Sequence, residues 1–172
     1  MEKIILTGGP GSGKSSILLG LETKGEYVVR EAAEDVIKYF QARGIQEPWT
    51  KPGFQEKILE LQLQREAQIP AGIERVWLDR GIIDGMAYAE KDSGLYNVIK
   101  EKAGTEMHKY TRVFLVEPLT SCDTNTVRRE NLDEAVTLGN RLAEEYTLMG
   151  YKPVRVPAIG VEKRVESVLG DV

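Results

Sequence analysis

The segment GGPGSGKS, residues 8–15, constrains the fold of this chain more than any other feature of its sequence. Four of its eight residues are glycine, and it lies between an apolar run, Ile4-Ile5-Leu6, and a helix-like segment from about Lys14 to Lys24. Glycine permits left-handed backbone angles and the close approach of other groups. The pattern therefore predicts a strand, a tight loop of inward-facing backbone N–H groups and a helix, in that order.

The same segment fits the pattern G-x-x-x-x-G-K-[ST], which is typical of loops that enclose phosphate groups. The loop N–H groups and the N-terminus of the following helix both attract anions. Lys14 is expected to reach the β- and γ-phosphates of a nucleotide, and Ser15 to bind Mg²⁺. The phosphate-binding residues predicted here are Gly8, Gly9, Pro10, Gly11, Ser12, Gly13, Lys14, Ser15 and Ser16. The alternative is a glycine-rich turn that only connects a strand to a helix.

Short apolar runs alternate with segments of helical period along the whole chain. Strands are expected at 4–6, 27–29, 76–79, 113–116 and 154–156. Helices are expected at about 14–24, 32–43, 54–69, 133–149 and 161–169, with one or two more between 80 and 110. This alternation is typical of a three-layer α/β fold with a mostly parallel sheet. Since no linker or repeat interrupts it, residues 1–172 are expected to form a single domain.

The apolar run Val76-Trp77-Leu78 ends abruptly in Asp79 and Arg80. An acidic residue that ends a second apolar strand helps to hold Mg²⁺ in phosphate-binding proteins of this kind, which is the role expected of Asp79. Arg80 cannot act as a base, but it can bind phosphate or acceptor oxygens through two nitrogens. The pair therefore favours transfer to a bound acceptor over hydrolysis by a positioned water. The alternative is that Asp79 caps the following helix and Arg80 pairs with a nearby acid.

The composition excludes several classes of protein. The chain has 172 residues and a net charge of −4, which argues against binding to a nucleic acid polymer or an anionic membrane. Cys122 and His108 are single residues of their type, so an internal disulfide, a Cys/His zinc site and a histidine-based triad within this chain are excluded. No signal peptide or membrane-spanning run is visible. We expect a cytoplasmic protein, a monomer or homodimer, without membrane insertion.

Several segments together resemble one family of phosphate-binding proteins. Their order along the chain is TGGPGSGKSS, REAA (30–33), FQ (54–55), LDRGIIDGMAY (78–88), VRRE (127–130) and EEYTLMGYKPVRVP (144–157). They resemble the AAA-domain ATPase/kinase P-loop family related to the NadR-type kinase domain and, more distantly, deoxynucleoside and nucleoside monophosphate kinases. The resemblance implies a nucleotide-kinase-like P-loop NTPase fold with strand order 2-3-1-4-5. That order would place Asp79 and Arg80 beside Lys14 and Ser15.

The resemblance also implies residues for the phosphoryl acceptor. Glu31 stands where deoxynucleoside kinases carry an acid that takes the proton of the acceptor hydroxyl, and a carboxylate there can act as a base. Phe54 and Gln55 match a pair that grips a base in those kinases, while Gln62 and Arg65 are weaker candidates on the same helix. The alternatives are that Glu31 only favours a helix N-terminus, that Phe54 anchors the core and that Gln55 lies on the surface.

The polar stretch of about 117–132 is expected to be a mobile flap. In the similar kinases this position carries a lid whose arginines stabilise phosphoryl charge. Arg128 is therefore a candidate catalytic residue and Arg129 a candidate nucleotide-binding residue. The alternative is a solvated pair that bonds to nearby acids. Pro157, after the last expected strand, is a candidate contact for adenine through its backbone.

Two functions from different classes remain open at this stage. The first is an ATP- and Mg²⁺-dependent phosphotransferase, a small-molecule kinase in which Lys14, Glu31, Asp79, Arg80 and Arg128 act on a small acceptor such as a nucleoside or nucleotide. The second is a P-loop ATPase or GTPase that serves as a nucleotide-dependent switch or binding module without a small acceptor. A nucleotide-binding subunit that serves assembly is a third. The absence of an N-K-x-D motif favours ATP over GTP.

Overall fold

The computed structural model describes residues 1–119 and 132–172 of the chain. At its centre lies a five-stranded sheet in the order β2-β3-β1-β4-β5, and all four neighbouring pairs are parallel. The strand order and the three-layer α/β class expected from the sequence are therefore confirmed. The strands are β1 (Glu2–Thr7), β2 (Tyr27–Val29), β3 (Arg75–Asp79), β4 (Arg112–Val116) and β5 (Val154–Val156).

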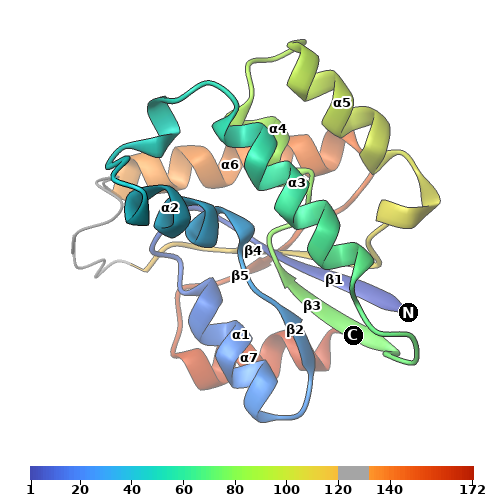
Figure 1. Ribbon diagram of the computed structural model, residues 1–172. Helices are drawn as coiled ribbons and strands as arrows, with labels where there is room; N and C mark the ends of the chain where they lie inside the picture. The colour runs from blue at the N-terminus through green and yellow to red at the C-terminus, as the bar shows by residue number, and fades with distance from the viewer. Residues whose placement is uncertain (120–131) are drawn as a thin grey trace.

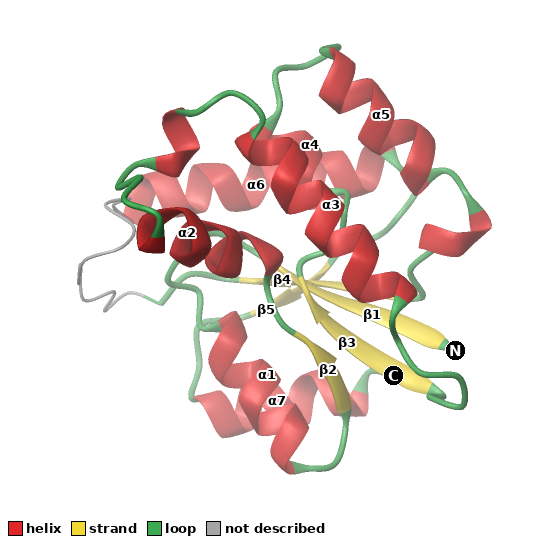
Figure 2. Cartoon of the chain, viewed as in Figure 1, coloured by secondary structure: helices red, strands yellow, loops and turns green. Residues whose placement is uncertain are grey.

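Helices cover both faces of this sheet, as Figures 1 and 2 show. On one face lie α1 (Lys14–Thr23) and α7 (Val161–Gly170). The other face carries α3 (Phe54–Ala67), α4 (Asp84–Tyr88), α5 (Gly94–Ala103) and α6 (Leu132–Leu148), with α2 (Ala32–Ala42) beside α3. Two short 3₁₀ helices, η1 (Pro48–Thr50) and η2 (Glu106–His108), complete the described elements.

The core consists of two apolar clusters separated by the sheet. Alternate residues of a strand point to opposite faces, so Ile4 and Leu6 of β1 pack toward α1 and α7, whereas Ile5 packs toward the other layer. In β3, Trp77 packs toward α1 and α7, whereas Val76 and Leu78 pack toward the other layer. Both faces are buried, which explains why these strands are continuous apolar runs in the sequence rather than alternating ones.

The register of the sheet brings the two motifs of the sequence together. Asp79, the last residue of β3, pairs with Leu6 of β1, two residues before the glycine-rich loop begins at Gly8. The helix that follows β1 covers one face of the sheet, and α4, which follows β3, covers the other. In parallel α/β sheets, ligands bind at the carboxyl ends of strands whose connections diverge in this manner.

The helix α3 buries polar as well as apolar residues. Leu59 and Leu63 pack against the core, but the residues of α3 that are buried besides Phe54 are Gln62 and Glu66. Their partners lie on distant segments: Glu66 accepts hydrogen bonds from the Lys3 Nζ and Tyr110 hydroxyl. Of the helices in the described ranges, none is both long and apolar enough to cross a membrane.

Candidate active site

The glycine-rich loop 8–13 has the backbone that its sequence predicts. Gly8 has a φ of 143°, and a Cβ atom there would lie 2.4 Å from the carbonyl oxygen of Val116. Gly13 has a φ of 85° and immediately precedes α1. No side chain caps the N-terminus of α1 within the described part of the chain. Glycine is thus required at both positions, and the start of α1 presents N–H groups suited to an anion.

Lys14 is buried, and its side chain folds back over the loop. Its Nζ donates hydrogen bonds to the carbonyl oxygens of Gly8 at 3.0 Å and Gly9 at 3.1 Å, and to the Ser12 hydroxyl at 3.3 Å. These bonds keep a cation at the centre of the loop. The arrangement agrees with the phosphate-binding role expected of Lys14.

Asp79 connects β3 to the start of α1. The Ser15 hydroxyl donates to Asp79 Oδ2 at 3.2 Å, while Asp79 Oδ1 is buried and has no hydrogen-bond partner among the residues described. Burial raises the pKa of the Asp79 carboxyl and Glu31 adds to this, whereas Lys14, Arg80 and Ser15 oppose it. A buried carboxylate oxygen without a partner is costly, and a bound water or cation would satisfy it.

This carboxylate and the Ser15 hydroxyl fit a magnesium ion. Mg²⁺ prefers oxygen ligands, and it commonly binds through one or two protein groups, substrate phosphates and water. In residues 1–119 and 132–172 there is no cluster of three or more His, Cys, Asp or Glu side chains that would hold a metal by themselves. A metal at Asp79 would therefore depend on nucleotide phosphates for its remaining ligands.

Arg80 has an unusual backbone conformation, and both its backbone N–H and its carbonyl are hydrogen-bonded. Its φ is 69°, its N–H donates to the Leu6 carbonyl, and its own carbonyl accepts a hydrogen bond from Gln62 Nε2 at 3.2 Å. A non-glycine residue held at positive φ costs free energy and often marks a functional site. Tyr110 reinforces the turn, because its hydroxyl accepts from the Ile82 N–H at 2.8 Å.

The guanidinium of Arg80 lies between two carboxylates. Its Nε donates to Glu31 Oε1 and its Nη1 to Asp84 Oδ1, both at 2.9 Å. Burial by itself would lower the pKa of Arg80, but Tyr88, Glu31 and Asp84 outweigh it and raise the pKa well above the usual value. Its Nη2 is buried without a hydrogen-bond partner in the described structure. The predicted alternative, pairing of Arg80 with a nearby acid, is thus present, while one terminal nitrogen of the same guanidinium has no partner among the described residues.

Asp84 joins the elements of the site. Besides Arg80, it accepts hydrogen bonds from the Thr7 hydroxyl at 2.7 Å, the Gly81 N–H at 3.1 Å and the Tyr146 hydroxyl at 2.6 Å. It therefore connects the end of β1, the turn after β3 and α6. Asp84 thus supports the turn after β3, and its bonds to Thr7 and Tyr146 are visible only in the folded structure.

A cleft of about 640 Å³ opens beside Arg80. Its walls include the four main candidates for contact with an acceptor, which are Glu31, Phe54, Gln55 and Arg80. Phe54 is also 5% exposed and packs edge-on against Phe40, so it serves the core as well. Gln62 and Trp49 line the cleft too. Arg65 does not line the cleft; it donates hydrogen bonds to the backbone carbonyls of Arg30 and Glu31.

Three further residues predicted at the site are Arg128, Arg129 and Pro157. Arg128 and Arg129 belong to 120–131, as does most of the expected flap 117–132, and thus lie outside the described residues. Pro157 follows β5, and its carbonyl oxygen accepts a hydrogen bond from Arg164 Nε at 2.8 Å. A backbone contact of Pro157 with adenine therefore remains a prediction.

Known proteins support the fold described above. A family model described as an AAA domain matches residues 3–164. Among solved structures, NadR protein in complex with NR superposes with a TM-score of 0.77 at 18% identity, covering 98% of this chain and 51% of that chain. Deoxyadenosine kinase from M. mycoides, with products dCMP and dCDP, gives a TM-score of 0.68 at 17% identity, covering 98% and 97%.

A second NadR structure, in complex with NAD and AMP-PNP, has a TM-score of 0.73 at 17% identity and covers 98% of this chain and 49% of that chain. This chain therefore spans about half the length of NadR. No protein in the curated comparison matches significantly. At these identities the structural likeness supports a nucleotide-kinase-like P-loop fold. Because the family model spans nearly the whole sequence, the chain belongs to the AAA-domain family of P-loop proteins.

Proposed function

We propose that this protein is an ATP- and Mg²⁺-dependent phosphotransferase that acts on a small, hydroxyl-bearing acceptor in the cleft. The observation that carries the proposal is that two consecutive residues, Asp79 and Arg80, each have one buried side-chain atom without a hydrogen-bond partner in the described structure: Asp79 Oδ1 and Arg80 Nη2. Asp79 bonds to Ser15 on the phosphate-loop side, and Arg80 lines the cleft. In this proposal Asp79 serves the nucleotide site, and the next residue, Arg80, serves the acceptor site.

The similar structures agree with a kinase. NadR has been solved with NR and with NAD and AMP-PNP, and the M. mycoides enzyme is a deoxyadenosine kinase. Those ligands belong to those proteins, and their relevance here rests on the shared fold and on the site residues of this chain. We carry over only the class of reaction, transfer of a phosphoryl group to a small molecule.

On the donor side, the N–H groups of 8–16 and the Lys14 ammonium would bind the phosphates of ATP. Ser15 and Asp79 would hold Mg²⁺, which neutralises phosphate charge when bound. Pro157 would contact the adenine through its backbone. Arg128 and Arg129 are proposed to neutralise phosphoryl charge, as the sequence predicts.

On the acceptor side, Glu31 and Arg80 would act as a unit. The bond between Arg80 Nε and Glu31 Oε1 fixes the orientation of the carboxylate at the cleft wall. Glu31 would accept the proton of the acceptor hydroxyl as its oxygen bonds to the terminal phosphorus and ADP departs. Arg80 Nη2 would donate a hydrogen bond to the oxygen on which charge develops. Phe54 and Gln55 would hold the body of the acceptor.

The charges of the cleft favour an acceptor without its own phosphate group. Three acidic residues line it, Glu31, Glu47 and Asp84, whereas Arg80 is the one basic residue among its described lining. Arg80 is already bonded to Glu31 and Asp84. A phosphate on the acceptor would therefore meet net negative charge. A nucleoside is expected to bind at least about tenfold more tightly than its 5′-monophosphate, a difference of ~1.4 kcal/mol.

Trp49 provides a direct test of acceptor binding. It lines the cleft and is 49% exposed, whereas Trp77, the other tryptophan, is fully buried in the core. Nucleosides and their 5′-monophosphates would be titrated into protein saturated with Mg·ADP while tryptophan fluorescence is recorded. A saturable change with a nucleoside, absent in Trp49→Phe and weaker with the monophosphate, is expected. If no compound changes the signal, the nucleotide-dependent switch becomes the better explanation.

A further inference from the structure

Arg164 of α7 is a buried cation that the sequence analysis did not identify. It is 2% exposed, and each nitrogen of its guanidinium donates to a backbone carbonyl. Nη1 bonds to Ser12 O at 2.5 Å, Nε to Pro157 O at 2.8 Å and Nη2 to Glu117 O at 3.1 Å. These carbonyls belong to the segments that follow β1, β5 and β4. A single side chain therefore joins the phosphate loop to the segments that follow β4 and β5.

The backbone that carries Arg164 is held firmly against α1. Val165, the next residue, packs on Gly20 of α1, where an added Cβ atom would lie only 2.7 Å from Val165 Cγ2. Because α1 begins at Lys14, directly after the phosphate loop, this contact fixes the distance between Arg164 and the loop. The guanidinium lies against Gly13, where an added Cβ atom would be 3.4 Å from Arg164 Nη1.

The electrostatics of Arg164 differ from those of Arg80. No carboxylate accepts a hydrogen bond from Arg164 in the described residues; the Glu117 carboxylate bonds to Arg155 instead. Burial lowers the pKa of Arg164, and the charge of Glu117 opposes this only in part. Burying a charge that is satisfied by carbonyl dipoles alone is costly. An anion bound in the adjacent loop would offset that cost.

The bond to Ser12 also orients the loop. In a trans peptide the C=O and N–H groups point in opposite directions. With the Ser12 carbonyl held on Arg164, the N–H of Gly13 must point away from Arg164. We propose that Arg164 is a positioning residue for the phosphate donor, which aims the Gly13 N–H at the β-phosphate and adds positive potential beneath the loop. This inference rests on the phosphate-binding part of the proposed function and on none of its acceptor chemistry.

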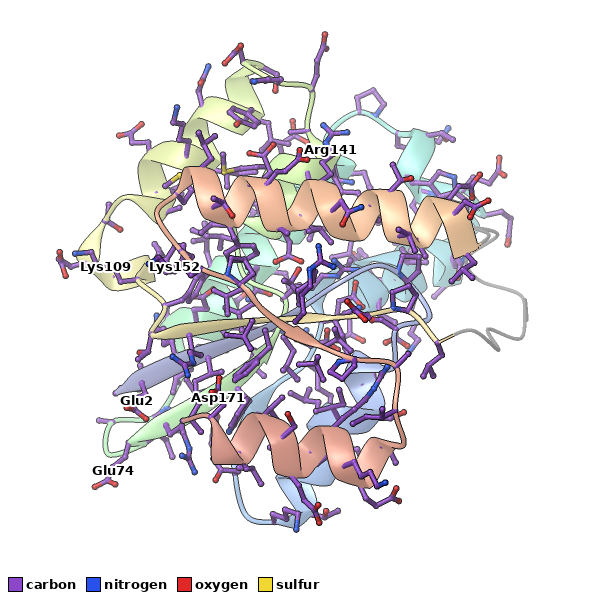
Figure 3. All side chains as sticks on the ribbon, turned by 180° about the vertical axis from the view of Figure 1, so that it is seen from behind. Glu2, Glu74, Lys109, Arg141, Lys152 and Asp171 are labelled. Atoms are coloured by element: carbon purple, nitrogen blue, oxygen red, sulfur yellow. The ribbon has the colours of Figure 1, made fainter. Side chains whose placement is uncertain are left out.

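The test measures nucleotide affinity without turnover. Wild-type protein, Arg164→Met and Arg164→Lys would be titrated calorimetrically with Mg·ADP and with AMP, and the melting temperature of each without nucleotide would be recorded. Arg112→Met is the matched control, because Arg112 pairs with Asp171 at the opposite end of the sheet, where β1 and β3 begin (Figure 3). Arg164→Met is expected to weaken the affinity for Mg·ADP about tenfold or more, as for loss of a hydrogen bond to a charged group. Its affinity for AMP is expected to fall less than about twofold.

Arg164→Lys keeps the charge but cannot reach three carbonyls with one ammonium. Its affinity for Mg·ADP is expected to be about fivefold weaker than that of the wild-type protein, a loss smaller than that of Arg164→Met. Equal losses of AMP and Mg·ADP affinity in Arg164→Met, or wild-type Mg·ADP affinity in Arg164→Lys, would overturn the positioning role. If Arg164→Met does not fold, the Lys variant alone decides. Failure of the wild-type protein to bind Mg·ADP would instead contradict the phosphate-donor site itself.

Discussion

Arg80 is the residue on which the site is built. Its left-handed backbone, its bonds to Glu31 and Asp84, and its contact with the ring of Tyr88 at 5.7 Å place a guanidinium permanently at the cleft wall. A side chain fixed in this way needs no reorganisation when charge develops on a reacting group. The same bonds mean that Arg80 has a structural as well as a proposed catalytic role.

Replacement of Arg80 by Met should therefore destabilise the protein strongly. Without the guanidinium, Glu31 and Asp84 remain as buried carboxylates, and breaking a buried ion pair from one side costs about 3–5 kcal/mol. Arg30→Met is the control, since Arg30 pairs with Glu22 on the surface, where such pairs contribute ~0–1 kcal/mol. The free energies of unfolding in urea give the comparison. Similar values for the two variants would show that the Glu31–Arg80–Asp84 cluster does not support the fold.

Local motifs in the sequence predicted roles for Lys14, Ser15, Asp79 and Arg80, and the strand order implied by the family resemblance predicted that they lie together. The structure has that strand order and adds Glu31 as a partner of Arg80. The sequence could not reveal which groups bond to one another. Arg80 could have faced solvent, and its two carboxylate partners follow from packing. Arg164 lies 152 residues from Ser12 and belongs to no motif, so only the folded structure shows their contact.

At the scale of elements, β3 serves as the platform of the site. Asp79 is its last residue. Near its start, β3 is hydrogen-bonded to Glu26, the residue just before β2. Glu26 accepts hydrogen bonds from Arg75 and from the Trp77 indole N–H at 2.8 Å. The hydrogen bond from Arg75 lowers the pKa of Glu26, although burial opposes it.

The hydrogen bond between Arg75 and Glu26 makes the stability of the protein depend on pH. Because the pKa of Glu26 in the folded protein lies below its unfolded value of 4.5, the stabilisation is present above that value and is lost as the pH falls through the folded pKa. Glu26→Gln should lose about 1–2 kcal/mol of unfolding free energy at pH 7. The deficit should shrink as the pH is lowered below the unfolded value. Denaturant unfolding of both proteins from pH 7 to pH 3 measures it, and a deficit that stays constant would rule out this linkage.

The elements themselves followed from the sequence more completely than their contacts. Apolar runs identified all five strands, since strands buried on both faces must be apolar along their length. The burial of Gln62 and Glu66 in α3 could not be predicted, because apolar periodicity does not identify buried polar residues. Gln62 and Glu66 are buried because Arg80, Lys3 and Tyr110 supply their hydrogen-bond partners from other segments.

At the scale of the whole molecule, the sheet separates two functions of the proposed enzyme. The layer of α1 and α7 carries the phosphate loop and Arg164, whereas the opposite layer carries the acceptor cleft over α3 and α4. The end of β3 lies where the two meet. We propose that 1–172 act as one domain in which this junction performs phosphoryl transfer.

The measurement that tests this account most directly is ³¹P NMR of the protein with Mg·ATP and a panel of nucleosides, compared with Asp79→Asn. We expect a new phosphoester resonance that grows with ADP in the wild-type protein and is at least about 100-fold slower in the variant, since Asp79 would hold the metal. Slow release of inorganic phosphate at one rate, with or without any acceptor, would contradict phosphoryl transfer in this cleft.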